Sequence, residues 1–258
     1  MILRRTGLEA ILALTNPIVM AICPLLINGV NQIGKVYMKV ILFGASGMVG
    51  SAVLRESLLA TDVEKVLTIG RSALKLTHPK LESIVLNNLY DYQDVMEIIA
   101  EYDACLFCLG TSSGDRSEEE YIQLNQTLPL TVAEAFHKAN PEMAFVYISG
   151  KGTDSTESGK VAWARIKGKT ENSLLGIGFK AVYLLRPALI IPKNGEQSKT
   201  TVYRLLYQYT GWAMQMVQGL FPSMITDTEK MGRAIFNLLR KNAASAVIEN
   251  AQINSIAK

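Results

Sequence analysis

The sequence predicts an α/β fold: a doubly wound parallel sheet with a small helical region at its C-terminal, substrate side. From Val40 onward, short apolar runs rich in β-branched and aromatic residues alternate with helical patterns. The first of these runs ends in a glycine-rich turn. At 258 residues, 49% of them hydrophobic, the chain can bury one sizeable core. We therefore expect one domain of this kind, without an internal repeat or linker.

The glycine-rich turn joins the first predicted strand to the first predicted helix. Residues 40–43, Val-Ile-Leu-Phe, have the composition of a buried parallel strand. Gly44, Gly47 and Gly50 follow at a spacing of three, and residues 51–59 then have a helical period. The glycines therefore stand where a strand becomes a helix.

This arrangement predicts dinucleotide binding. Gly44 allows a sharp turn, Gly47 lets backbone N–H groups approach a pyrophosphate, and Gly50 lets the helix pack close to the strand. The helix N-terminus supplies free N–H groups and a positive dipole end. The alternative is an ordinary turn, but strand before and helix after favour the cofactor. The expected contacts are Gly44, Ser46, Gly47, Met48, Val49 and Gly50.

The second strand, residues 65–69, indicates which dinucleotide binds. It ends in Gly70-Arg71-Ser72, about twenty residues past the third glycine. An acidic residue there would bind the ribose 2′-OH of NAD, whereas Arg71 can hold a 2′-phosphate with Ser72 as a second donor. We therefore expect NADP rather than NAD. The alternative is that Arg71 is a solvated surface residue.

The next strands are predicted over residues 81–86 and 104–109. Asn88 and Leu89 follow the former and are placed to meet adenine. The loop 110–114 follows the latter, at the edge where open α/β sheets bind ligands. Helical patterns cover residues 91–102 and 118–138, the second broken at 127–129. Further cofactor contacts are expected at Leu109, Gly110, Thr111 and Asn125.

The last part of the chain completes the sheet and adds the helical region. Strands are predicted over residues 144–148, which end at Ser149, and over 181–187. From about residue 196 the pattern changes, and an aromatic and aliphatic helical surface is expected over 200–221. A capping-box spelling at Thr226 to Glu229 predicts a final helix through Leu239. This region is expected to cover the substrate end of the cleft.

Charge and cysteine content exclude several classes. A formal charge of +3 gives no reason to expect nucleic acid as a partner. Cys23, Cys105 and Cys108 are too few for a disulfide framework and favour a reducing cytoplasm. Cys105 and Cys108 lie in one predicted strand, where residues three apart point to opposite faces, so we expect no redox pair. His78 and His137 have no acidic or cysteine cluster beside them, so no metal is expected.

Residues 1–37 are expected to lie outside the fold that occupies residues 38–258. Their apolar runs follow Arg4-Arg5 but are interrupted by Glu9, Pro17 and Pro24, so no unbroken run of about 20 apolar residues spans a membrane. Two interpretations stay open: a start site assigned too far upstream, and a peripheral hydrophobic anchor. The predicted location is cytoplasmic, with membrane association through this segment under the second interpretation.

Taken together, these motifs resemble the atypical short-chain dehydrogenase/reductases, specifically the Tat-interacting-protein-like oxidoreductase branch, which is NAD-dependent-epimerase-like. The resemblance runs from Met38 nearly to the end and implies an NAD(P)-binding Rossmann fold. It is carried by the glycine turn, Cys108-Leu109-Gly110-Thr111, Ser149-Gly150-Lys151-Gly152-Thr153-Asp154, Lys167-Gly168 and Arg186-Pro187.

The resemblance also implies a catalytic Ser, a Tyr, and a Lys four residues after the Tyr. Lys167 fits the Lys, which would hold the nicotinamide ribose, and Ser149 fits the Ser that polarises the substrate oxygen. The position of the Tyr is taken by Trp163. An indole N–H donates a hydrogen bond but does not exchange a proton near neutral pH. The departure at Trp163 therefore bears directly on catalysis.

Three functions are compatible with this sequence. The first is NADP(H)-dependent reduction of a small carbonyl substrate, with the proton supplied by water or by Tyr147 on the same strand as Ser149. The second is a non-catalytic NADP(H)-binding sensor in which Trp163 stacks on the ligand and Lys167 grips the ribose. The third is an epimerase with tightly bound cofactor. The substrate and the oligomeric state are left open.

Overall fold

The computed structural model describes residues 37–111, 114, 117–196, 223–241 and 245–258. The predicted helical surface over residues 200–221 lies outside these ranges, as does the predicted N-terminal extension except for Tyr37. The described fold begins with strand β1 at Met38.

The centre of the fold is a seven-stranded sheet with the order β3-β2-β1-β4-β5-β6-β9. Every neighbouring pair is parallel. The chain builds outward from β1 in one direction and then returns to place β4 on its other side, which is the topological switch point of a doubly wound sheet. The predicted fold class is therefore confirmed. The strands are β1 (Met38–Phe43), β2 (Val63–Gly70), β3 (Leu81–Val85), β4 (Ala104–Phe107), β5 (Ala144–Ile148), β6 (Ala181–Arg186) and β9 (Val247–Glu249).

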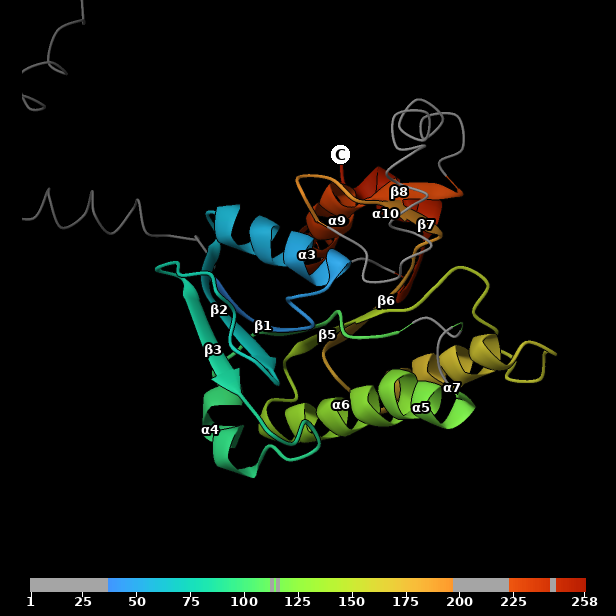
Figure 1. Ribbon diagram of the computed structural model, residues 1–258, viewed down its shortest axis with the longest axis horizontal. Coiled ribbons are helices and arrows are strands. Elements are labelled where there is room, and N and C mark those ends of the chain that lie inside the picture. The colour runs from blue at the N-terminus through green and yellow to red at the C-terminus, as the bar shows by residue number, and fades with distance from the viewer. Residues whose placement is uncertain (1–36, 112–113, 115–116, 197–222, 242–244) are drawn as a thin grey trace, which may run out of the picture. The chain divides into compact units, whose positions relative to one another are not determined.

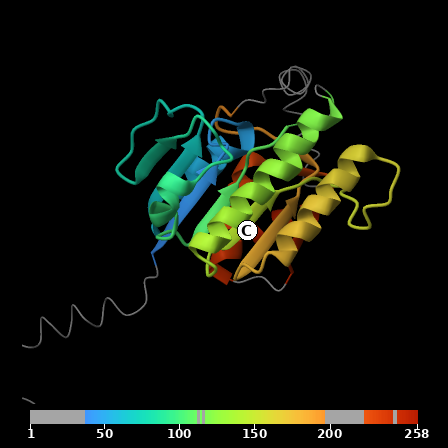
Figure 2. The same cartoon turned by 90° about the horizontal axis from the view of Figure 1, so that it is seen from below.

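Helices cover both faces of this sheet (Figures 1 and 2). One face carries α3 (Met48–Leu59), α9 (Thr228–Lys241) and α10 (Asn250–Ile256). The other carries α4 (Met96–Ile99), α5 (Glu118–Ile122), α6 (Leu128–Ala139) and α7 (Ala162–Gly176). Each face has its own hydrophobic core. Because the central strands β1, β4 and β5 are buried on both faces, they show the continuous apolar runs from which the parallel sheet was predicted.

Cys105 and Cys108 lie on opposite faces of the sheet. Cys105 is part of the core beneath α6, whereas Cys108 packs against the core beneath α3. Both thiols are free, and burial raises the pKa of Cys108 to about 12. A deprotonated, reactive thiolate is therefore disfavoured at both positions.

Three local predictions differ from the structure. Residues 91–102 form only a short 3₁₀ turn, η1 (Gln93–Val95), and the single turn α4. A parallel pair outside the main sheet, β7 (Leu189–Ile191) with β8 (Ile225–Asp227), was not predicted. Because Asp227 ends β8 and accepts a hydrogen bond from the Lys230 N–H at 2.8 Å, it caps α9 in place of Thr226.

No helix among the described residues is long and apolar enough to span a bilayer.

The helical stretch after residue 117 is continuous through its predicted break. A π-helical segment, Gln123–Thr127, joins α5 to α6, with Pro129 in the first turn of α6. Proline has no N–H, so Pro129 cannot donate to the carbonyl of Asn125 four residues earlier. The helix widens there instead of ending, and the Asn125 carbonyl becomes available to other donors.

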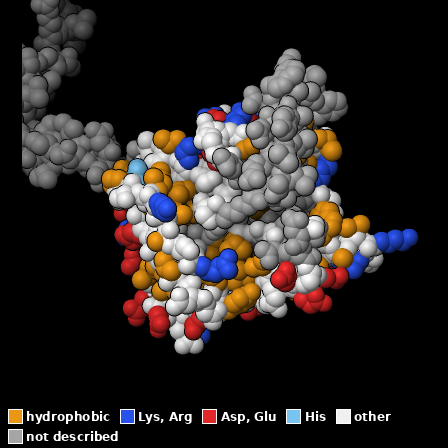
Figure 3. All heavy atoms as spheres, in the orientation of Figure 1, with side chains coloured by type: hydrophobic (Ala, Val, Ile, Leu, Met, Phe, Trp, Pro, Cys, Tyr) orange, Lys and Arg blue, Asp and Glu red, His pale blue; other side chains and the backbone are white. Residues whose placement is uncertain are grey.

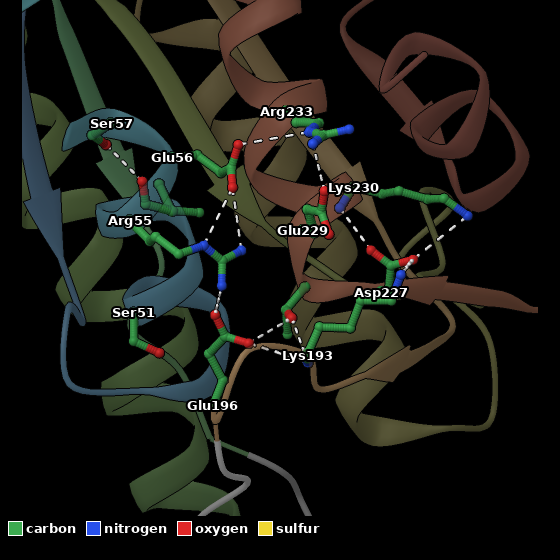
Figure 4. Close-up of polar contacts among 12 residues, drawn as sticks. Ser51, Arg55, Glu56, Ser57, Lys193, Glu196, Asp227, Glu229, Lys230 and Arg233 are labelled. Atoms are coloured by element: carbon green, nitrogen blue, oxygen red, sulfur yellow. Dashed lines mark hydrogen bonds and ion pairs between the residues drawn. The ribbon is translucent and has the colours of Figure 1, made fainter. Parts of the chain in front are cut away.

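A polar network ties α3 to α9 and to the segment after β7 (Figure 4). Arg55 on α3 pairs with Glu196, and Glu196 also accepts a hydrogen bond from Thr228 at 3.0 Å. Glu56, the next residue on α3, pairs with Arg55 and contacts Arg233 of α9. The helix that follows the glycine turn is thereby fixed against the C-terminal part of the fold.

Candidate functional site

The glycine turn has the geometry that its sequence requires. Gly44 has φ +78°, and a β-carbon there would lie 2.7 Å from the backbone of Cys108. A β-carbon on Gly50 would lie 2.1 Å from the Gly44 carbonyl oxygen. Gly47 caps α3 without a side-chain partner, so the first-turn N–H groups remain available to an anion. The close backbone contacts at Gly44 and Gly50 therefore require glycine.

The loop after β4 meets the π-helical segment at Asn125. This side chain is 1% exposed, and its Oδ1 has no hydrogen-bond partner among the described residues. A β-carbon on Gly110 would lie 3.2 Å from this oxygen. A buried acceptor without a donor is rare in native proteins and calls for an explanation. A hydroxyl or amide of a bound dinucleotide is a donor of the required kind, so the residues present fit such a group.

Asn125, Tyr147 and Lys167 form one buried hydrogen-bonded network. The Tyr147 hydroxyl donates to the Asn125 carbonyl at 2.8 Å, and Lys167 Nζ donates to Tyr147 Oη at 2.9 Å. Lys167 also donates to the carbonyl of Ile148 at 3.1 Å. The Thr170 hydroxyl, one turn along α7, lies 3.0 Å from the same Asn125 carbonyl oxygen and 2.8 Å from that of Ile166, and shares its one proton between them. The carbonyl released by Pro129 thus organises the residues around Lys167.

Burial sets the protonation behaviour of this network. Lys167 is 7% exposed, and its burial lowers its pKa to about 8, an effect that nearby Glu171 opposes. Tyr147 is fully buried, and its burial raises its pKa well above the usual value. Lys167 is therefore the group of the pair that changes charge closer to neutral pH.

The geometry does not support the expectation that Tyr147 supplies a proton to substrate. Its side chain is enclosed in the hydrophobic core, and its single proton is donated to the Asn125 carbonyl. Its oxygen accepts from Lys167. Tyr147 therefore positions Lys167, and no face of its hydroxyl is exposed to a ligand.

Ser149 follows β5 and pairs with a residue that the sequence did not single out. Its Oγ lies 3.0 Å from Thr153 Oγ1, and Thr153 donates to the Gly150 carbonyl at 2.8 Å. Because Thr153 has one hydroxyl proton, Ser149 is the donor between the two. Ser149 must turn its proton away from Thr153 to polarise a substrate oxygen.

Trp163 is half-buried and covers the loop that follows Ser149. A β-carbon on Gly152 would lie 3.5 Å from its Cη2, and one on Gly150 would lie 4.0 Å from its Cζ3. The indole therefore packs on the glycines of this loop. Trp163 and Lys167 lie on the same side of α7, since residues four apart are neighbours on a helix.

The predicted adenosine contacts are less closely grouped. Arg71 and Ser72 are exposed just after β2, and Arg71 has no partner among the described residues. Asn88 is exposed, and its Oδ1 accepts from the Tyr90 N–H at 3.0 Å. Leu89 is 7% exposed and belongs to the hydrophobic core, so its side chain is turned away from a ligand. The expected contact between Leu89 and adenine therefore rests on the Leu89 backbone and stays a prediction.

Several residues of the network were missed by the sequence reasoning. Thr153 and Thr170 are buried and form hydrogen bonds with predicted site residues. Thr170 could have been identified from the sequence, because it lies one helical turn after Lys167. Glu171 is 1% exposed and pairs with Arg186 at the end of β6. This ion pair joins α7 to the sheet. No cluster of three or more metal-ligating side chains occurs in the described part of the chain.

Replacing Lys167 with methionine is expected to stabilise the protein at neutral pH. The pKa of Lys167 in the folded chain, about 8, lies below the ordinary value of 10.5, so protonated Lys167 favours the unfolded chain. This penalty is fully present below pH 8 and disappears as the pH rises toward 10.5. We expect Lys167→Met to raise the free energy of unfolding by about 1–3 kcal/mol at pH 7. Urea unfolding of both proteins at pH 7 and pH 10 checks this prediction. An equal increase in the free energy of unfolding at both pH values would contradict it.

About half of the chain matches the model of a known family, and most of it aligns with curated proteins. Residues 40–162, from β1 to the start of α7, match the NAD dependent epimerase/dehydratase family. The chain is 25% identical over 195 residues to the protein fmp52-2, mitochondrial, of Aspergillus terreus, covering 75% of this chain and 82% of that protein. It is 28% identical over 163 residues to fmp52 of Emericella nidulans, covering 61% and 69%.

These relatives correct the predicted location. Those from Aspergillus terreus, Meyerozyma guilliermondii and Chaetomium globosum are all named mitochondrial. The expectation of a cytoplasmic protein rested on the low cysteine content, which indicates a reducing compartment without distinguishing one such compartment from another. The prediction of a cytoplasmic location is therefore contradicted.

Solved structures share the fold at low sequence identity. The UDP-N-acetylglucosamine 4-epimerase of Methanobrevibacter ruminantium superposes with a TM-score of 0.62 at 19% identity, covering 82% of this chain and 76% of that one. The Bordetella bronchiseptica enzyme WbmH, solved in complex with NAD+, superposes with a TM-score of 0.58 at 15% identity, covering 81% and 73%. The chain therefore shares its doubly wound, Rossmann-type α/β fold with these proteins.

Proposed function

We propose that this protein binds NADP(H) at the carboxyl edge of its sheet and acts as an oxidoreductase on a small carbonyl substrate. The observation that carries the proposal is a continuous series of contacts along that edge. The glycine turn touches the end of β4, the loop after β4 meets Asn125, and Asn125 is bonded through Tyr147 to Lys167. A dinucleotide that lies on the glycine turn would extend along this series.

The chain's own residues would bind and orient the cofactor. The N–H groups at the start of α3 would hold the pyrophosphate, and Lys167 would donate its remaining N–H to the nicotinamide ribose. Ser149 would polarise the substrate carbonyl. The bound cofactor would supply the hydride to the carbonyl carbon, and water would supply the proton to its oxygen, because Trp163 and Tyr147 offer none.

A second candidate is a non-catalytic NADP(H)-binding sensor. The specific observation that favours it is the absence of an accessible titrating hydroxyl among the described residues around Lys167. Tyr147 is enclosed, Ser149 donates to Thr153, and Trp163 stands where the family has its Tyr. In this case Trp163 would pack against the ligand, and binding would not lead to turnover.

Titration followed by a turnover assay separates the two candidates. Binding of NADPH to the full chain is measured by calorimetry. NADPH oxidation is then measured in the presence of each of a range of small aldehydes and ketones. Oxidation that saturates with one carbonyl supports the reductase. Tight NADPH binding without NADPH oxidation by any of these carbonyl compounds supports the sensor. Failure to bind NADPH contradicts both candidate functions.

Arg71 is expected to make NADPH bind more tightly than NADH. Its guanidinium is free among the described residues at the end of β2, where a 2′-phosphate would lie. Arg71→Asp should weaken NADPH binding by about 1.5–3 kcal/mol, the range of a charge-assisted hydrogen bond, while affecting NADH little. Lys138→Asp, the same change of charge at the exposed end of α6 that leads into β5, serves as control. Equal affinities for the two nucleotides in the unmodified protein would refute the expectation.

A further inference from the structure

A hollow runs along α3 and is lined at one end by Ala45 of the glycine turn. It lies between α3 and the connection from β2 to β3, and it has a volume of about 610 Å³. Sites for small ligands typically enclose roughly 300–1,000 Å³. On the face where α3 lies, hydrophobic and basic side chains occur together (Figure 3). Its lining follows α3 from Ser51 to Leu59, and the eight residue-to-residue rises between them span about 12 Å.

The floor of this hollow is made of leucines. Leu54 and Leu58 contribute from α3, and Leu74 and Leu76 contribute from the connection. Leu59 and Leu76 are 68% and 51% exposed, which leaves large aliphatic side chains in contact with water. Such clustered exposure of apolar side chains marks a binding surface more often than isolated exposure does.

Charge at the rim has one sign. Lys75 lines the hollow and has no hydrogen bond or ion pair among the described residues. His78 also lines it, and only its Nδ1 is engaged, accepting from the Lys80 N–H at 3.1 Å. Arg55 is already paired with Glu56 and Glu196 (Figure 4). No aspartate or glutamate is among the described residues that line the hollow.

We propose that the hollow binds a single linear aliphatic chain with an anionic end group, such as a medium-chain carboxylate. The leucines remove the alkyl chain from water, and Lys75 pairs with the anionic end. A single extended aliphatic chain of medium length matches the length of about 12 Å along α3. The proposed ligand uses neither Lys167 nor Ser149, although the hollow reaches Ala45 in the glycine turn.

Calorimetric titration of the full chain tests the proposal with octanoate, decanoate and decanol below their aggregation concentrations. Each buried methylene strengthens binding by about fourfold, so decanoate should bind about fifteenfold more tightly than octanoate. Decanol lacks the charge and should bind about tenfold more weakly than decanoate. The absence of saturable decanoate binding, or affinity independent of chain length, would overturn the proposal. Binding confined to phosphatidylcholine/phosphatidylserine vesicles would overturn it as well.

Variants locate the site. Leu76→Glu should weaken decanoate and decanol binding about tenfold or more, because it places a carboxylate on the apolar floor. Lys75→Ala should weaken decanoate about tenfold and leave decanol unchanged. Leu175→Glu is the matched control, since Leu175 is a 45% exposed leucine on α7, away from the hollow. Equal losses of decanoate affinity in Leu76→Glu and Leu175→Glu would show that decanoate binds elsewhere. This result does not depend on whether the protein binds NADPH.

Discussion

Gly168→Ala is expected to lower the melting temperature by roughly 6 °C or more and to abolish cofactor binding. A β-carbon on Gly168 would lie 1.8 Å from the carbonyl oxygen of Asp154, which is backbone and cannot rotate away. Asp154 is itself bonded to α7, its N–H donating to the Ala164 carbonyl at 3.0 Å. Either α7 or the loop must therefore move, at an expected loss of about 3 kcal/mol or more of the free energy of unfolding.

Gly176→Ala is the control for this prediction. Gly176 ends the same helix, and a β-carbon there meets no atom within 4 Å. Alanine is the better helix former, so this variant should be as stable as the unmodified protein or more stable by about 0.4–1 kcal/mol. Thermal unfolding of both variants, followed by circular dichroism, compares them directly. Similar melting temperatures for the two would show that the Asp154 loop yields to Gly168→Ala.

The expected effect on binding follows from the position of Gly168 in the chain. The neighbouring Lys167 reaches Tyr147 Oη and the Ile148 carbonyl over distances of 2.9 and 3.1 Å. A shift of α7 by more than 1 Å breaks hydrogen bonds of this length. Lys167 and Gly168 therefore act together. Gly168 lets α7 approach the Asp154 loop closely enough for Lys167 to reach β5.

The centre of the sheet could be predicted because its strands β1, β4 and β5 are buried on both faces. Val40 to Phe43 and Phe145 to Tyr147 are completely buried, and such strands are read directly from continuous apolar runs. The last strand, β9, has three residues, of which Glu249 is exposed. A short edge strand has no such pattern and forms only because β6 offers it an open edge. That strand depends on tertiary structure and could not be predicted locally.

The site was predictable where backbone conformation demands a particular residue. Gly44 and Gly50 must be glycine, because a β-carbon at either position would overlap with neighbouring backbone atoms. The pairing of Ser149 with Thr153, by contrast, depends on how the loop after β5 folds back, and nothing in the spacing specifies it. The burial of Tyr147 could have been anticipated, because alternate residues of a strand share a face and Phe145 precedes it in an apolar run.

Trp163→Tyr is expected to raise the rate of NADPH-dependent carbonyl reduction by about 10²–10⁴-fold, the usual contribution of proton transfer from a placed side chain. A tyrosine at this position would lie on the same side of α7 as Lys167, one turn away. The ammonium of Lys167 would lower the pKa of the new hydroxyl, and the hydroxyl would replace water as the proton donor.

Trp163→Phe separates the hydroxyl from the change of ring size, because it opens the same space above Gly150 and Gly152 without supplying a proton. We expect kcat/KM for a small aldehyde to rise in Trp163→Tyr and to stay at the unmodified level in Trp163→Phe, with NADPH affinity similar in all three proteins. A rise in both variants would mean that the indole blocks the substrate, not that a proton donor is lacking. Brisk turnover in the unmodified protein that persists in Trp163→Phe but is lost in Tyr147→Phe would contradict the role assigned to Tyr147, since the enclosed hydroxyl would then have to reach the substrate. If neither variant oxidises NADPH while both bind it, the sensor gains support, because a restored acid is without effect when no substrate carbonyl lies beside the cofactor.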